Sequence, residues 1–434
     1  MELIGPYQGS GFQEPKYIIS RADGQVVQLP RLLYLVAEQL DGQRDLEQLA
    51  AALTVEFGRA ITAEQVSFLV ENKLRPAGIA AVAGVVPGGA GSAVAAPRRP
   101  DALLALRYRL PVVPARVSWV IAAVFRPFYW PPVLVLALTA FVGLDVAVVV
   151  RGGVAQILPS AQALVAQPAL TLLVFGLVLA SGMFHECGHV TACRYGGARP
   201  GVMGLGIYLV WPAMYSTVTD AYRLSRGGRL RTDLGGIYFN VVSIAGMSLA
   251  YLCTGAPWLL VAIVVLHVET AWQFLPSIRL DGYYILADVI GVPDLFSYLR
   301  PVLRSLVPGR AAHPRVAELK PWTRRVISLW VAGVIPVLLF FLVNFLILAP
   351  RILPVVAHSL LALLDAIAAA VATGQPARAA LGMVQVVLLL LPWAGIAMVA
   401  VGWSRTFGRL ALARRRKART AGGAEAPAEH RASS

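Results

Sequence analysis

The chain has 434 residues, of which 57% are hydrophobic and only 14% are charged. A soluble globular domain carries about 25% charged residues, so this composition excludes an ordinary soluble fold and predicts a membrane protein in contact with a lipid bilayer. The net charge of +15 does not indicate a nucleic-acid partner, because the basic residues flank apolar segments, as in cytoplasmic loops.

Residues 1–82 predict a small winged-helix-like α+β domain. Two short strand candidates, Tyr17–Ser20 and Val26–Leu29, flank Asp23-Gly24, a pair that favours a hairpin turn. Apolar residues at helical spacing then predict three short amphipathic helices. Pro30 marks the start of the first helix. Capping-box-like pairs mark the starts of the second helix, at Asp45 with Gln48, and of the third, at Thr62 with Gln65.

This order of elements, together with the segment LDGQRDLEQLAAAL, resembles the peptide-recognition domain of the PQQ-synthesis chaperone class. The resemblance implies that residues 1–82 bind the leader segment of a ribosomally made peptide, often by strand addition. The alternative is a winged-helix domain with only a scaffolding or regulatory role. The first residues do not show the pattern of a signal peptide, in which a basic segment is followed by an apolar one. We therefore expect the N-terminus in the cytoplasm.

The rest of the chain divides by composition. Residues 83–100 are rich in Gly, Ala and Pro and predict a flexible linker. Residues 101–403 predict a polytopic, mainly α-helical membrane domain, and residues 404–434 a basic cytoplasmic tail. Apolar segments of about 20 residues predict six transmembrane helices, near 131–150, 169–191, 234–253, 258–276, 327–348 and 381–403.

The orientation follows from the arginines. The loops Arg194–Arg231 and Arg279–Arg325 are basic, so we expect both on the cytoplasmic side of the cell membrane, together with both termini. Counting Ile352–Ala372 as a further span would place the basic tail outside. Its Asp365 would also cost ~2.5–3.5 kcal/mol at a helix centre. We therefore interpret this segment as a re-entrant or surface-lying helix.

The segment His185-Glu186-Cys187-Gly188-His189 fits the pattern H-E-x-x-H at the end of an apolar helix. Residues i and i+4 project from one helix face, so His185 and His189 can bind one metal ion. Glu186 lies beside them and can take a proton from metal-bound water, whose pKa zinc lowers to about 7. A mutually satisfied polar cluster is the alternative, but ionisable groups buried in a membrane span are usually functional.

A catalytic zinc site usually takes three protein ligands. Asp281, in the segment PSIRLDGYYILAD, is the candidate for the third ligand. It is expected to end the fourth span on the same side of the membrane as the histidines, and Gly282 after it permits a bend of the backbone.

HECGH on one span and LDG on a later one resemble the site-2 protease family of intramembrane zinc metalloproteases, over roughly residues 168–290. The resemblance implies that His185, His189 and Asp281 hold one Zn²⁺ per chain and that Glu186 is the general base. That family typically has an Asn three residues before the Pro of its second motif. Here Gln273 precedes Pro276, so substrate positioning by this longer amide departs from the family pattern.

The combination of both parts resembles the peptide zinc metalloproteases associated with peptide natural-product systems. It implies a membrane-embedded zinc metalloendopeptidase that cleaves a peptide or a membrane-associated precursor. One alternative is a non-proteolytic membrane partner that passes a bound peptide to an exporter, although such a protein has no need to keep Glu186. A transporter with a proton relay is a third reading, but we find no inverted repeat.

Several further residues carry secondary expectations. Asn240, in the third span, can hydrogen-bond either a substrate peptide or a neighbouring helix. Residues 204–215 predict a β-hairpin or a re-entrant strand, whose edge could hold a substrate segment. Asp288 is expected to support the cytoplasmic end of its helix. His267 and Glu269 are expected to form a polar pair inside the bundle, with Glu269 ~18 Å from Asp281 along a helix.

Overall fold

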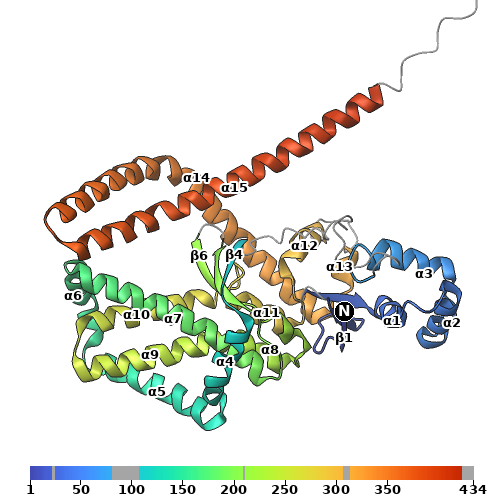
Figure 1. Cartoon of the computed structure of the whole chain (residues 1–434), viewed down its shortest axis with the longest axis horizontal. Coiled ribbons are helices and arrows are strands. Elements are labelled where there is room, and N and C mark those ends of the chain that lie inside the picture. The colour runs from blue at the N-terminus through green and yellow to red at the C-terminus, as the bar shows by residue number, and fades with distance from the viewer. Residues whose placement is uncertain (22–24, 81–106, 209–210, 306–312, 423–434) are drawn as a thin grey trace, which may run out of the picture.

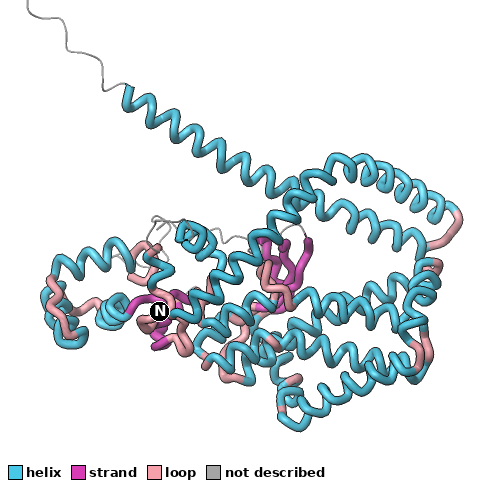
Figure 2. The backbone as a smooth tube through the Cα atoms, turned by 180° about the vertical axis from the view of Figure 1, so that it is seen from behind, coloured by secondary structure: helices cyan, strands magenta, loops and turns pink. Residues whose placement is uncertain are grey.

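The computed structural model describes residues 1–21, 25–80, 107–208, 211–305 and 313–422. It is mainly helical and contains two three-stranded sheets. In Figure 1 the N-terminal elements lie at one end of the molecule and a helical bundle at the other. Figure 2 shows the strands in two groups, one beside the N-terminus and one between the N-terminal elements and the bundle.

The first sheet has the antiparallel order β1-β2-β3 and precedes three short helices. The two predicted strands and the three predicted helices are confirmed, with Asp23-Gly24 outside the described residues. Strand β1 was not predicted, because Gly5 and Pro6 interrupt its apolar pattern and a register shift follows Leu3. The elements are β1 (Glu2–Pro6), β2 (Lys16–Ser20), β3 (Val26–Pro30), α1 (Arg31–Gln39), α2 (Leu46–Phe57), α3 (Ala63–Leu69) and the π-helical turn η1 (Val70–Leu74).

Both predicted capping boxes are present. The Asp45 carboxylate accepts a hydrogen bond from the Gln48 amide at 2.7 Å, and the Gln48 side chain accepts one from the Asp45 amide. Thr62 and Gln65 do the same for α3. These bonds satisfy backbone N–H groups that a helix start otherwise leaves free. A separate core lies behind them, built on Ile19, Val36, Leu53, Val66 and Leu74.

Residues 7–13, between β1 and β2, leave the sheet and pack into the membrane part of the chain. The Gly11 amide donates to the Gly291 carbonyl at 3.0 Å, and the Lys320 amide donates to the Gly11 carbonyl at 2.9 Å. Phe12 is buried in a core cluster with Ile290. A Cβ on Gly11 would lie 2.2 Å from the Ile290 carbonyl oxygen, so only glycine permits this approach. The N-terminal part therefore shares a core with the rest of the protein.

Among the described residues, five helices are long and apolar enough to cross a membrane, and they indicate a membrane protein. They are α5 (Pro131–Val150), α7 (Pro168–Tyr195), α9 (Gly235–Thr254), α14 (Pro321–Ala372) and the apolar first part of α15 (Pro376–Gly422). Three shorter apolar helices accompany them: α4 (Ala115–Val124), α6 (Gly153–Val165) and α10 (Pro257–Gln273).

Two of the expected spans differ from the structure. The span expected at 258–276 is formed by α10, which has 17 residues and is shorter than the other five. The span expected at 327–348 and the segment Ile352–Ala372 are not separate elements, because both belong to the 52-residue helix α14. Prolines inside a helix each remove one hydrogen bond but are tolerated in apolar helices, and α14 continues through Pro350 and Pro354 (Figure 1). Ile352–Ala372 is thus the second part of α14, and its expected re-entrant or surface-lying placement stays a prediction.

The second sheet has the order β4-β5-β6 and lies beside α7. The hairpin predicted at 204–215 is confirmed by β5 (Met203–Tyr208) and β6 (Trp211–Ser216), and β4 (Arg107–Val113) adds a strand that was not predicted.

Short helical elements complete the described chain: η2 (Arg126–Tyr129), η3 (Thr219–Arg223), α8 (Arg226–Asp233), α11 (Asp281–Ile290), η4 (Leu295–Tyr298), α12 (Leu299–Ser305) and α13 (Pro314–Ala317). The linker expected at 83–100 and the end of the tail lie outside the described residues.

Candidate metal centre

The structure brings His185, His189 and Asp281 together. Nε2 of His185 lies 3.1 Å from Nε2 of His189. The Asp281 carboxylate lies across both rings, with Oδ2 3.2 Å from His185 Nε2 and Oδ1 3.4 Å from His189 Nε2. One ligand atom from each residue therefore falls in a common cluster within 4.8 Å. Both histidines are buried.

The separations between these donor atoms fit a tetrahedral zinc site. Zinc lies ~2.0–2.2 Å from nitrogen and oxygen ligands, and at a tetrahedral angle two such ligands stand about 3.3 Å apart. The three observed separations bracket this value. Oδ2 of Asp281 is also buried without a hydrogen-bond partner among the described residues, which is costly unless a cation balances it. Two imidazoles and a carboxylate are the ligand types that zinc prefers.

The charge of the Asp281 carboxylate is favoured by its neighbours. Burial alone raises the pKa of Asp281, but the imidazoles of His189 and His185 outweigh burial and hold this pKa well below its usual range. The carboxylate therefore remains ionised at neutral pH, in the form that binds a metal.

Helix α8 orients the second histidine. His189 Nδ1 lies 2.8 Å from the Thr232 carbonyl oxygen, so Nδ1 donates to this carbonyl and Nε2 is the ring nitrogen that faces the cluster. The Thr232 hydroxyl in turn donates to the Gly228 carbonyl at 3.0 Å. Sequence reasoning missed this carbonyl partner, because no side-chain pattern marks a backbone acceptor.

The start of α9 packs directly against the two histidine rings. A Cβ on Gly236 would lie 2.3 Å from His185 Nε2 and 2.4 Å from His189 Nε2. Between the two histidines on α7, the Gly188 carbonyl accepts a hydrogen bond from the Tyr129 hydroxyl at 2.9 Å, and Gly235 touches Gly188 through their backbones. The pair Gly235-Gly236 in the sequence is the signal that points to this close approach.

We expect Gly236→Ala to abolish stoichiometric zinc binding, because the added methyl group occupies the space into which both ligand nitrogens point. The measurement is the metal content of purified protein. Gly246→Ala on the same helix is the matched control, since its Cβ would meet nothing within 4 Å. Equal zinc contents in the two variants would contradict the site.

Glu186 lies on α7 between the ligands and is buried. Within the described part of the chain its carboxylate makes no hydrogen bond or ion pair, and its charge acts on His189. A carboxylate next to the metal ligands with no other partner is available to accept a proton from a bound water.

The two candidate substrate-positioning residues contact each other. The Asn240 amide, buried on α9, donates to Gln273 Oε1 at 3.0 Å and to the Thr270 hydroxyl at 3.1 Å. Asn240 lies one turn after Gly236, the residue that touches both histidines, so this amide pair stands close to the metal cluster along α9. Of the two roles considered for Asn240, the interhelical bond is the one present.

The expected pair of His267 with Glu269 is wrong. His267 Nε2 pairs instead with Asp145 of α5 at 2.9 Å, and Ser248 of α9 donates to the same carboxylate at 3.4 Å. The ~18 Å estimate assumed one straight helix, whereas α10 ends at Gln273 and the chain folds back before Asp281.

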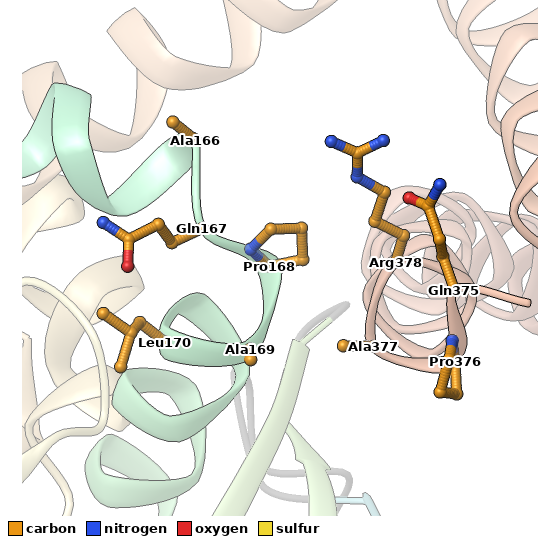
Figure 3. Close-up of a pocket in the computed structure, with 9 residues that line it drawn as sticks. All are labelled: Ala166, Gln167, Pro168, Ala169, Leu170, Gln375, Pro376, Ala377 and Arg378. Carbon is orange, nitrogen blue, oxygen red and sulfur yellow. The ribbon is translucent and has the colours of Figure 1, made fainter.

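A cavity of about 370 Å³ lies elsewhere, between the turn that joins α6 to α7 and the turn that joins α14 to α15 (Figure 3). His185 is fifteen residues, or ~22 Å, further along α7 than Leu170 in this cavity. The cavity is therefore separate from the metal cluster. It is lined by Ala166, Gln167, Pro168, Ala169, Leu170, Gln375, Pro376, Ala377 and Arg378.

Among known proteins, the chain is similar to a Bacillus subtilis (strain 168) protein named "Putative peptide zinc metalloprotease protein YydH". The two are 27% identical over 114 residues, which cover 26% of this chain and 45% of that protein. The match thus spans less than half of the relative. No family model matches the sequence, and no solved structure matches it.

Proposed function

We propose that this protein is an intramembrane zinc metalloendopeptidase of the site-2 protease type, which cleaves a peptide or a membrane-associated precursor. The observation that carries the proposal is the convergence of His185, His189 and Asp281, whose Nε2 atoms lie 3.1 Å apart and 3.2 and 3.4 Å from the two oxygens of the Asp281 carboxylate. The apolar helices around this cluster and the similarity to a protein named as a zinc metalloprotease support it.

The chemistry follows from the donor set. His185, His189 and Asp281 would hold the zinc ion, one per chain, which supplies Lewis acidity and a water of pKa about 7. Glu186 would serve as the general base for the attacking water and as the general acid for the leaving amine. The Thr232 carbonyl fixes the tautomer of His189 throughout.

Substrate handling is assigned to the residues around this centre. The joined amides of Asn240 and Gln273 position the peptide, and residues 1–82 act as a peptide-recognition domain. The peptide or precursor and the lipid bilayer are the partners in this reading. The described residues offer no support for the exporter considered above.

The test of the proposal is peptide maturation in cells that co-express candidate precursor peptides. Wild-type protein is expected to shorten its precursor in a zinc-dependent manner, and Glu186→Gln is expected to leave it uncut. Mass spectrometry of the peptide reads out both results.

We further propose that residues 1–100, the loop 194–231 and the chain after Arg405 are cytoplasmic. Helix α9 starts at the metal cluster and ends near Cys253, which is exposed, whereas Cys187 and Cys193 are buried. A membrane-impermeant maleimide should therefore label Cys253 on intact cells. A Cys253→Ser, Gly227→Cys variant should be labelled only after lysis, since Gly227 is exposed on α8. Labelling of position 227 on intact cells would reverse the proposed topology.

A further inference from the structure

A fully buried cation lies close to the metal centre but outside it. Arg229 of α8 is 1% exposed, and its Nε donates to Asp288 Oδ1 of α11 at 2.9 Å. The Tyr7 hydroxyl, from the segment after β1, donates to the same carboxylate oxygen at 3.1 Å. The guanidinium carbon also lies 4.3 Å from the centroid of the Tyr7 ring, which is a cation–π contact. Tyr7, Arg229 and Asp288 are called the Arg229 network below.

Every nitrogen of this guanidinium is used. Nη1 donates to the Leu224 carbonyl at 3.0 Å, and Nη2 donates to the Gln8 carbonyl at 2.9 Å. Arg229 thus ties together the start of α8, helix α11 and the N-terminal segment. Burial and the charge of Asp288 raise the pKa of the neighbouring Asp233 carboxyl well above its usual range.

The two helices joined by Arg229 and Asp288 are those that set the geometry of two metal ligands. Helix α8 carries the Thr232 carbonyl that orients His189, and α11 begins with Asp281 itself. Thr232 lies three residues after Arg229 on α8, and Asp288 lies seven residues after Asp281 on α11. A shift of either helix would therefore move a ligand or its hydrogen-bond partner.

Buried ion pairs seldom add much net stability, because the cost of removing both charges from water offsets their attraction. They do impose one arrangement on the elements they join, since a displaced partner leaves an unpaired buried charge. Groups that orient metal ligands contribute to metal affinity in the same indirect way.

We propose that Tyr7, Arg229 and Asp288 are positioning residues of the metal centre, which hold α8 and α11 in register. Tyr7 brings the N-terminal segment into this role, so residues outside the membrane helices help to set the metal geometry. The inference rests on the proposed zinc site, and it adds a connection between that site and the sheet that begins at β1.

The test compares three full-length variants with wild type in detergent. Tyr7→Phe removes only the hydroxyl that donates to Asp288, and Asp288→Asn removes the charge that balances Arg229. Tyr34→Phe is the matched control, because its ring is buried in the N-terminal core and its hydroxyl makes no hydrogen bond among the described residues. The readouts are zinc affinity by competition with a chelator and the visible spectrum of the Co²⁺-substituted protein.

We expect Asp288→Asn to weaken zinc binding by ~10–100-fold, the range found for groups that orient metal ligands. Tyr7→Phe should weaken it by ~3–10-fold, since Arg229 still holds Asp288. Both should alter the Co²⁺ spectrum, while Tyr34→Phe should match wild type. Where Asp288→Asn does not fold, Tyr7→Phe decides the question.

Wild-type affinity and an unchanged Co²⁺ spectrum in Tyr7→Phe and in any folded Asp288→Asn protein would overturn the positioning role and leave the zinc site standing. A wild-type protein that binds no zinc would instead remove the proposed function, and this inference with it. An equal loss of zinc affinity in Tyr34→Phe would show that the effect is general destabilisation. That result would also overturn the positioning role.

Discussion

Glu186→Gln is expected to lower peptide cleavage by ~10²–10⁴-fold while zinc remains bound, which is the usual contribution of a general base. The substitution preserves side-chain size and hydrogen bonding but removes the carboxylate that must take a proton from the attacking water. Zinc should stay, because the three donors that face one another come from other residues. Mass spectrometry of the co-expressed peptide and metal analysis of the same preparation provide the two readouts.

Glu269→Gln is the control for this substitution. Glu269 is a second carboxylate whose charge acts on His185, but it lies on α10, outside the cluster of donors. Removing its charge should leave cleavage within a few-fold of wild type. If Glu186→Gln matured the peptide as well as wild type, hydrolysis at this zinc would not be the function.

The local part of the site could be predicted from the sequence because it depends on helix geometry alone. Two histidines four residues apart on a helix must share a face, and the observed Nε2–Nε2 separation of 3.1 Å follows from that spacing. The capping boxes at Asp45 and Thr62 were predictable for the same reason, since each is complete within four residues.

Contacts between distant segments were harder to place. Asp281 was chosen correctly as the residue that meets the histidines, but it was expected at the end of a span and instead begins the separate helix α11. The break in the chain between α10, which ends at Gln273, and α11, which begins at Asp281, is a feature that no straight-helix estimate can show. The Thr232 carbonyl and the steric role of Gly236 belong to the same class, because each depends on packing between helices.

The N-terminal region illustrates how composition can mislead. Its capped helices and the Gly/Ala/Pro segment after it predict a domain that is joined to the rest of the chain only by a flexible linker. The structure places Gly11 and Phe12 inside a core shared with α11 and α14, and Tyr7 against Asp288. Deletion of residues 1–82 would therefore expose part of that core and leave Arg229 with fewer partners. Point variants, which keep the chain intact, are the informative tests.

His185→Ala is expected to lose zinc and cleavage together. Only His189 and Asp281 would then remain, and a catalytic zinc site normally takes three protein ligands. The buried Asp281 carboxylate would also lose one of the two imidazoles that stabilise its charge. Zinc should raise the melting temperature of wild type, because a ligand that binds only the folded state stabilises it by mass action, and this rise should vanish in the variant.

His267→Ala makes the same chemical change at a histidine that pairs with Asp145, away from the cluster. It should keep about one zinc per chain and retain the zinc-dependent rise in melting temperature. Metal analysis and thermal unfolding thus separate loss of a ligand from loss of any membrane-embedded histidine. Stoichiometric zinc in His185→Ala would refute the three-ligand centre, since the remaining pair lacks the third donor whose 3.1 and 3.2 Å separations define the site.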